Sequence, residues 1–384
     1  MRGRGAVVLV LALAACDGRC GELPAPRGAD LPTDATVEGP PALPASRHDA
    51  HLHALAERAR LGARVPSIAY GRHTAEGTST SAVGLADVAA ARPSTDETRY
   101  QVASIAKIVV ALAVMQLVDA GRVSLDGDVS PIVGFAVGAG RRVTLRALLS
   151  HTAGLADRTA ELERATRDTA LDAFSRAYWA DARATRGGPD AGTYAYSNAG
   201  VALAALAVER IVGESYADHV HTHVFLPAGM TSCSFAPAPS DAVPHAARDG
   251  GTQERLGHAS HAVYPVVDLW CTVGDVLRLG RVLLGRGAVD GRRVVSSVRV
   301  ADMVTPVVGT ADDGQGLGVQ LRTIGGRRVV GHEGEDRGAT SALYVDLERG
   351  VVIAAIANGD AFGSGERARV RAFGDLVDGL ATRP

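Results

Sequence analysis

Strand-like segments lie near both ends of the chain, and the long middle has the apolar spacing of helices. Six segments are rich in apolar and β-branched residues: 65–70, 79–85, 317–324, 328–332, 341–345 and 351–357. Gly325-Gly326 between two of them predicts a two-residue hairpin turn. Amphipathic helices are predicted at about 50–62 and 366–380, and a mostly helical region at about 104–284. This order predicts an α+β fold. Both chain ends form one antiparallel sheet, helices flank it, a helical region is inserted, and a site lies where the two parts meet.

The first residues have the pattern of a secretory leader. Arg2 and Arg4 precede an unbroken apolar run at 6–15, which is too short to span a bilayer. The run ends in Leu-Ala-Ala-Cys16, which resembles a bacterial lipoprotein box. The resemblance implies a signal peptide at 1–15 and a lipid on Cys16, whose acyl chains would hold the protein to a membrane. The alternative is an ordinary signal peptide followed by an incidental cysteine.

The segment after the leader is rich in proline, alanine and glycine. We interpret 16–48 as the lipidated cysteine and a semi-extended tether, and 49–384 as one large domain. We therefore expect the domain to be lipid-anchored in the cell envelope, facing the periplasm or the exterior, with the choice between inner and outer membrane left open.

Composition excludes some classes of function. A net charge of −2, from 40 basic and 42 acidic residues, does not indicate binding to nucleic acid, which requires an excess of positive charge. If Cys16 carries a lipid, Cys20, Cys233 and Cys271 remain. Cys233 and Cys271 are able to pair in an oxidising compartment, but the sequence leaves this open. No C-x-x-C spacing indicates a zinc or redox site.

Lys107 is the only lysine in the chain, since the other 39 basic residues are arginine. Lysine differs from arginine in that its pKa can be lowered until it acts as a neutral base. Ser104 precedes it by three residues at the start of a predicted helix, so both side chains lie on one helix face. The pair predicts a serine nucleophile with an adjacent lysine base.

Two later segments complete a pattern that occurs in a known family. Tyr196-Ser197-Asn198 precedes a helical run, and His332-Glu333-Gly334 follows a strand-like segment. The order S-x-x-K, Y-x-N, H-x-G resembles that of the penicillin-binding proteins, class C β-lactamases, D-amino-acid peptidases and related carboxylesterases. Leu-Leu-Ser-His-Thr-Ala-Gly-Leu at 148–155 is also typical of them, and the resemblance runs from about 65 to 358.

The resemblance implies a role for each motif residue. Ser104 would attack an acyl carbonyl, while Lys107 and Tyr196 would share the work of the general base. Asn198, His332 and Gly334 would line the substrate position. The backbone N–H groups of Ser104 and Glu335 would form the oxyanion hole. The family implies no catalytic role for His151, which we expect to hold the loop around Gly154 together.

The third motif departs from the pattern of the β-lactamases. His332 stands where those enzymes carry a lysine, and it should be mostly neutral at pH 7. Glu333 replaces a small hydroxyl residue and would repel an anionic substrate if it faced the site. We therefore expect an esterase, a D-amino-acid peptidase or a DD-carboxypeptidase, acting through an acyl-enzyme on a small-molecule or peptide substrate, with peptidoglycan-derived peptides among the candidates. The alternatives are a class C-type β-lactamase and a catalytically silent lipoprotein that binds peptidoglycan or a protein.

We expect no cofactor and no metal. No G-x-S-x-G indicates an α/β-hydrolase elbow. His219, His221 and His223 alternate, but on a helix only His219 and His223 share a face. We interpret that face as solvated rather than as a metal site.

Overall fold

The computed structural model describes residues 47–138, 140–155, 157–181, 190–247, 253–361 and 367–382. The leader, Cys16, Cys20 and most of the tether lie outside these residues, so the anchor stays a prediction. In the described part, no helix is both long enough and apolar enough to cross a membrane.

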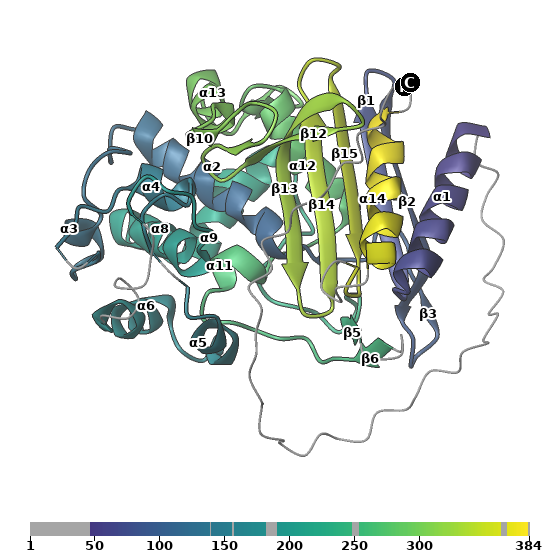
Figure 1. Cartoon of the computed structure of the whole chain (residues 1–384), viewed down its shortest axis with the longest axis horizontal. Helices are drawn as coiled ribbons and strands as arrows, with labels where there is room; N and C mark the ends of the chain where they lie inside the picture. The colour runs from purple at the N-terminus through teal and green to yellow at the C-terminus, as the bar shows by residue number, and fades with distance from the viewer. Residues whose placement is uncertain are drawn as a thin grey trace, which may run out of the picture.

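One large antiparallel sheet organises the molecule (Figure 1). Its strands lie in the order β10-β11-β12-β13-β14-β15-β1-β2-β3. They are β1 (Ser67–Thr74), β2 (Gly77–Asp87), β3 (Arg92–Pro93), β10 (Val308–Gly309), β11 (Gly314–Gln315), β12 (Gln320–Ile324), β13 (Arg327–Asp336), β14 (Ala339–Asp346) and β15 (Val351–Ala357). Because β1 pairs directly with β15, the two ends of the domain form one sheet, as the element order predicts. The expected hairpin is confirmed: Ile324 pairs with Arg327 across two glycines of positive φ.

The two faces of the sheet bury different helices, because side chains alternate along each strand. On β15, Ile353 and Ala355 pack with helices α1 (Arg47–Ala63) and α14 (Arg367–Thr382). Ala354 and Ile356 belong to the core on the opposite face. That core includes α12 (Val273–Leu284), which contacts β15, β14 and β1. The sheet is therefore a middle layer, covered by the terminal helices on one side and by α12 and the helical region on the other (Figure 1).

The helical region is built around α2 (Ala106–Asp119), whose residues are almost all buried, and α8 (Asn198–Val212), which packs against it. Around them lie η1 (Ala103–Ile105), α3 (Ser130–Val133), α4 (Leu145–Leu149), α5 (Thr159–Arg164), α6 (Leu171–Ala180), α9 (Tyr216–Val220), η2 (His221–Phe225), α10 (Leu226–Ala228), α11 (Tyr264–Val267) and α13 (Ser297–Val304). Three two-stranded ribbons complete the fold: β4 (Tyr100–Gln101) with β7 (Trp270–Cys271), β5 (His245–Ala247) with β6 (Gln253–Arg255), and β8 (Ala288–Val289) with β9 (Arg292–Arg293). The observed α+β architecture is the one that the sequence predicts.

Candidate active site

Ser104 lies where the sheet meets the helical region. It is the middle residue of η1, which leads into α2 and contacts β13, β14 and α11. Ala103 has a φ of 45°, so the turn carries a residue in the left-handed region just before Ser104. Such backbone positions concentrate at functional sites. The site therefore lies at the junction that the order of elements predicts.

Two donors converge on the hydroxyl of Ser104. Lys107 Nζ donates to Ser104 Oγ over 2.7 Å, and Tyr196 donates from its hydroxyl over 2.8 Å. Lys107 Nζ also lies 4.9 Å from the centre of the Tyr196 ring. The structure thus brings together the three residues that the sequence predicts as the catalytic set.

Burial sets the charge of both partners of Ser104. Lys107 is fully buried, and this lowers its pKa from 10.5 to about 7, although the carboxylates of Asp157 and Asp336 oppose the shift. Burial of the Tyr196 hydroxyl raises its pKa above the ordinary 10, although the hydrogen bond to Ser104 opposes this. Near pH 7, neutral Lys107 can accept a proton, while the hydroxyl of Tyr196 stays protonated.

Asp157 and His151 position Tyr196. Asp157 accepts hydrogen bonds from Ser197 Oγ (2.7 Å) and from the backbone N–H groups of Asn198 (2.6 Å) and Ala199 (3.2 Å) at the start of α8. This satisfies helix N–H groups that have no partner within the helix. His151 accepts from the Ser197 N–H over 3.1 Å.

His151 contacts the segment around Tyr196. Its ring lies 4.4 Å from the ring of Tyr196, and its carbonyl accepts from the Ala195 N–H over 2.8 Å. His151 adopts a φ of 58°, and burial, with Lys107 nearby, keeps its pKa well below 6.5. It is a neutral residue that holds the segment on both sides of Tyr196; that it also holds the loop around Gly154 stays a prediction.

Asn198 lies beside Tyr196 and carries a buried acceptor. It is the first residue of α8 and is partly exposed, and its Oδ1 has no hydrogen-bond partner among the described residues. Tyr194 and Tyr196 nearby are 41% and 37% exposed, so solvent reaches this side of Ser104. The placement fits the predicted contact of Asn198 with a substrate.

His332 is buried on β13, beside Tyr196. The two ring centres are 6.3 Å apart, and His332 Nδ1 donates to the carbonyl of Glu333. Burial lowers the pKa of His332 to about 3, and Lys107 contributes to this shift. Its Nε2 is buried and has no partner within the described part of the chain. His332 is therefore neutral at pH 7, as the sequence predicts, and it does not bring the positive charge of a lysine.

The face of Glu333 corrects one argument from the sequence. Glu333 is adjacent to His332 on a strand, so its side chain points to the opposite face of the sheet. There the hydroxyl of Tyr344, a residue of the core under α1 and α14, is its hydrogen-bond partner. Repulsion of anionic substrates by Glu333 is therefore not an obstacle in this site.

Gly334 brings strand β13 against the nucleophile. A Cβ at this position would lie 2.2 Å from Ser341 Oγ, 2.3 Å from the Val102 carbonyl oxygen and 3.2 Å from Ser104 N. Only glycine allows this approach. Glu335 follows and pairs with Thr340 at the end of the strand. The predicted oxyanion donors, Ser104 N–H and Glu335 N–H, are thus carried by backbone segments that meet at Gly334.

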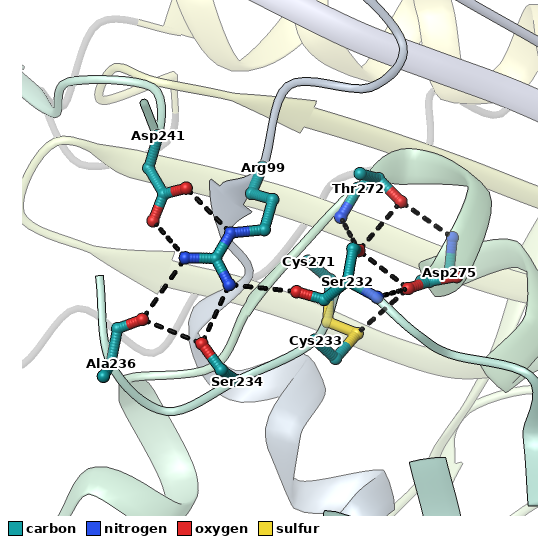
Figure 2. Close-up of a disulfide and its surroundings, with 9 residues drawn as sticks. All are labelled: Arg99, Ser232, Cys233, Ser234, Ala236, Asp241, Cys271, Thr272 and Asp275. Carbon is teal, nitrogen blue, oxygen red and sulfur yellow. Dashed lines mark hydrogen bonds and ion pairs between the residues drawn. A yellow bond between two sulfur atoms is a disulfide. The ribbon is translucent and has the colours of Figure 1, made fainter. Parts of the chain in front are cut away.

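A disulfide and a buried ion pair hold the strand that leads into Ser104. Cys233 and Cys271 are bonded, which settles the pairing that the sequence leaves open (Figure 2). Cys271 belongs to β7, which pairs with β4, three residues before Ser104. Arg99, just before β4, makes two 2.7 Å hydrogen bonds to Asp241.

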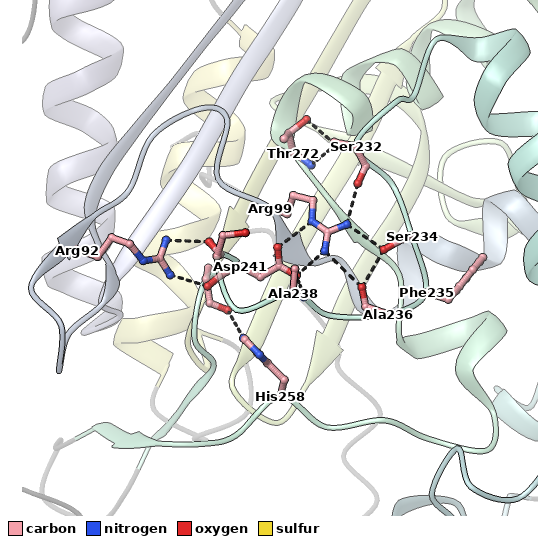
Figure 3. A network of polar contacts seen from close by, with 12 residues as sticks. Arg92, Arg99, Ser232, Ser234, Phe235, Ala236, Ala238, Asp241, His258 and Thr272 are labelled. Atoms are coloured by element: carbon pink, nitrogen blue, oxygen red, sulfur yellow. Dashed lines mark hydrogen bonds and ion pairs between the residues drawn. The ribbon is translucent and has the colours of Figure 1, made fainter.

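The same arginine ties β4 to the disulfide loop. Arg99 Nη1 donates to the Ser232 carbonyl over 2.9 Å, and Arg92 donates to the carbonyls of Ser240 and Asp241 (Figure 3). Planar, bidentate arginine contacts of this kind fix geometry as well as charge. The approach to the nucleophile is therefore cross-linked to the loops that carry Ser232 and Asp241.

Sequence reasoning missed three supporting residues. Asp157 follows the family-like segment 148–155 but gave no separate signal. Val266 accepts from Lys107 Nζ over 3.3 Å through its carbonyl, which no side-chain pattern reveals. Gln101 donates to Asp336 over 2.7 Å, next to the buried lysine.

Comparison with known proteins places the chain in a family. The family model described as Beta-lactamase matches residues 53–375. The chain belongs to this β-lactamase family. "Penicillin-binding protein 4" of Amycolatopsis lactamdurans is 32% identical over 284 residues, which cover 69% of this chain and 73% of that protein. "Esterase EstB" of Burkholderia gladioli is 34% identical over 183 residues, covering 43% and 46%.

Solved structures share the β-lactamase-type fold. The D-amino acid amidase from Ochrobactrum anthropi SV3, in complex with L-phenylalanine amide, superposes with a TM-score of 0.73 at 22% identity and covers 87% of this chain and 97% of that one. Together with the Ser104, Lys107 and Tyr196 geometry, these relatives identify the chain as a serine hydrolase of the β-lactamase family.

Proposed function

We propose that this serine hydrolase acts through an acyl-enzyme on esters or amides whose acyl group is uncharged near the scissile bond. The observation that carries the proposal is the pair of hydrogen bonds from Lys107 and Tyr196 to Ser104 Oγ. A nucleophile bonded to a base that titrates near neutrality is the arrangement needed for acyl transfer.

Each residue has one step in the proposed reaction. Neutral Lys107 accepts the Ser104 proton as Oγ attacks the acyl carbon. The backbone N–H groups of Ser104 and Glu335 stabilise the oxyanion, and one such donor contributes about 2.7–4 kcal/mol. The Tyr196 hydroxyl gives its proton to the leaving group and takes up the proton that Lys107 received, so both residues return to their starting states. Water then releases the acyl group from Ser104 in the reverse sequence of proton transfers.

The substrate class follows from His332. In the β-lactamases a lysine at this place would attract the carboxylate of the drug, but His332 is neutral and its pKa is about 3. The site therefore lacks at this position the charge that would favour an anionic substrate. Esters and D-amino-acid amides are the favoured candidate substrates, and the names of the esterase and amidase relatives agree with this choice. D-alanyl peptides are less favoured because their C-terminal carboxylate finds no positive charge at His332.

The test compares hydrolysis of a p-nitrophenyl ester by the purified protein with that of Ser104→Ala. Ser240→Ala is the matched control because Ser240 is exposed and lies outside the site. We expect wild type and the control to turn over the ester equally and Ser104→Ala to fall to background. Equal rates for all three proteins would contradict the acyl-enzyme and favour a silent binding protein. Faster turnover of a chromogenic cephalosporin than of any ester or D-amino-acid amide would favour the β-lactamase alternative.

We also propose that the protein is anchored in the cell envelope by a lipid on Cys16. The basic start, the short apolar run and the Leu-Ala-Ala-Cys sequence support this. Fractionation of cells that express wild type or Cys16→Ser tests it. Membrane association that survives the substitution would count against the lipid.

A further inference from the structure

Three potential metal ligands meet at the end of α8. Glu214 follows the Gly213 cap of this helix, His219 lies on α9, and His223 lies on η2. One ligand atom from each lies within 4.8 Å of the others. The η2 segment is a single π-helical turn, and such turns are frequent at functional sites.

His219 contradicts the expectation of a solvated face. Only 6% of it is exposed, whereas His221 and His223 are exposed. Its Nδ1 is 3.0 Å from Glu214 Oε1. Nδ1 is the ring nitrogen that faces Glu214, so it is the atom that His219 offers to a ligand shared with Glu214. Its Nε2 is buried without a hydrogen-bond partner among the described residues.

Gln116 adds a second such atom and fixes His223. Its Nε2 donates to the carbonyls of His223 and Val294, both over 2.7 Å. Its Oε1 is buried and lacks a partner in the part of the chain that the structure describes. Gln116, Glu214 and both histidines line one hollow of about 270 Å³. The hollow therefore presents several lone pairs on a backbone that is held in place.

We propose that this hollow binds a zinc-class divalent cation through Glu214, His219 and His223, at a site separate from Ser104. Two imidazoles suit Zn²⁺, Ni²⁺ or Cu²⁺, whereas Mg²⁺ and Ca²⁺ prefer oxygen ligands. Arg122, which also lines the hollow and donates to the Ile211 carbonyl, adds a positive charge. This charge opposes any cation in the hollow, so the three ligands must outweigh it.

The three ligand atoms need to move only slightly closer together to bind a zinc ion. Zinc–ligand bonds of about 2.0–2.2 Å in a tetrahedral site place ligand atoms about 3.3 Å apart. Glu214 and His223 are exposed and can move toward the buried His219. Three protein ligands leave the fourth position to water, so the site has the composition of an open zinc site.

The test titrates Zn²⁺ into the chelator-stripped full chain in detergent, in competition with a chromogenic chelator. The variants are His223→Gln and Glu214→Gln, and His221→Gln is the matched control because its exposed side chain lies outside the group. Titration of Co²⁺ gives a second readout, since its visible absorption reports coordination by imidazole. Thermal unfolding without metal shows that each variant is folded.

We expect wild type and His221→Gln to bind one equivalent with the same affinity. His223→Gln and Glu214→Gln should bind at least roughly tenfold more weakly, because each variant lacks one of the three ligands. If His223→Gln is unstable, Glu214→Gln makes the comparison, since Glu214 is 45% exposed. Absence of stoichiometric binding by wild type, or equal affinity of all four proteins, would overturn the proposal and leave only water in the hollow.

Discussion

The pKa of Lys107 makes the dependence of activity on pH the most informative measurement. With an ordinary pKa of 10.5, about one lysine in 3,000 would be neutral at pH 7. With its pKa at about 7, half of the Lys107 side chains are neutral at that pH. Burial thus raises the population of the active base roughly 1,500-fold at pH 7.

The sign follows from the role of Lys107 as a base. Its protonated form cannot accept the Ser104 proton, so kcat/KM should fall as the pH drops below about 7. Between pH 6 and pH 8 the neutral fraction rises from about 9% to about 91%, so the rate should rise roughly tenfold. The pKa of Tyr196 lies above 10, so its ionisation should not lower kcat/KM up to about pH 10.

The assay is ester hydrolysis from pH 5 to pH 10 under conditions in which the ester is stable. Lys107→Arg keeps a positive charge but has no accessible neutral form, so it should be inactive across the range. His332→Gln tests whether the change of rate near pH 7 belongs to Lys107, because a histidine whose pKa is about 3 cannot change the rate near pH 7. A midpoint above pH 9, a midpoint that disappears in His332→Gln, or activity in Lys107→Arg equal to wild type would refute the reasoning.

Three further perturbations test the support around Ser104. Gly334→Ala should lower kcat/KM for the ester by roughly 100-fold, because the added Cβ would push strand β13 away from the nucleophile. Gly257→Ala is the control: nothing lies near its Cβ position, so this variant should have the kcat/KM of wild type. Replacing both Cys233 and Cys271 by serine should lower the free energy of unfolding by roughly 4 kcal/mol, because the disulfide closes a loop with a sequence separation of 38. Denaturant titration measures this, and an unchanged unfolding midpoint would contradict it. A reductant should not destabilise the variant further. Asp157→Asn removes a carboxylate that raises the pKa of Lys107, so the acid limb of the pH profile should move to lower pH; a shift to higher pH would show that Asp157 acts otherwise.

Local pattern predicts the fold where side-chain periodicity or a turn is decisive. The Gly325-Gly326 turn and the strands on either side of it appear where expected. The long apolar helix after Ser104 is also present as α2. β1 pairs with β15, although nearly the whole domain separates them in sequence. The order of helices and strands along the chain is sufficient to predict this pairing.

The same reasoning fails where the outcome depends on which face a side chain occupies or on backbone contacts. Residue type alone leaves open whether Glu333 faces the site, and alternation along β13 turns it away from His332. Helical periodicity predicts a solvated His219, yet the packing of α9 buries it. Asp157 binds backbone N–H groups at the start of α8, and no side-chain spacing announces such a partner. The Cys233–Cys271 bond needed the two loops to be placed in space.

The charges around Ser104 also support the proposal that its substrate is uncharged. His332 is neutral because its pKa is low, and Tyr196 is neutral because its pKa is high. Lys107 is therefore the group bonded to Ser104 Oγ that changes charge near pH 7. A substrate carboxylate gains from this charge only when Lys107 is protonated, which is the form that cannot act as the base. Binding of an anion and attack by Ser104 thus favour opposite protonation states, whereas an uncharged ester or amide meets no such conflict.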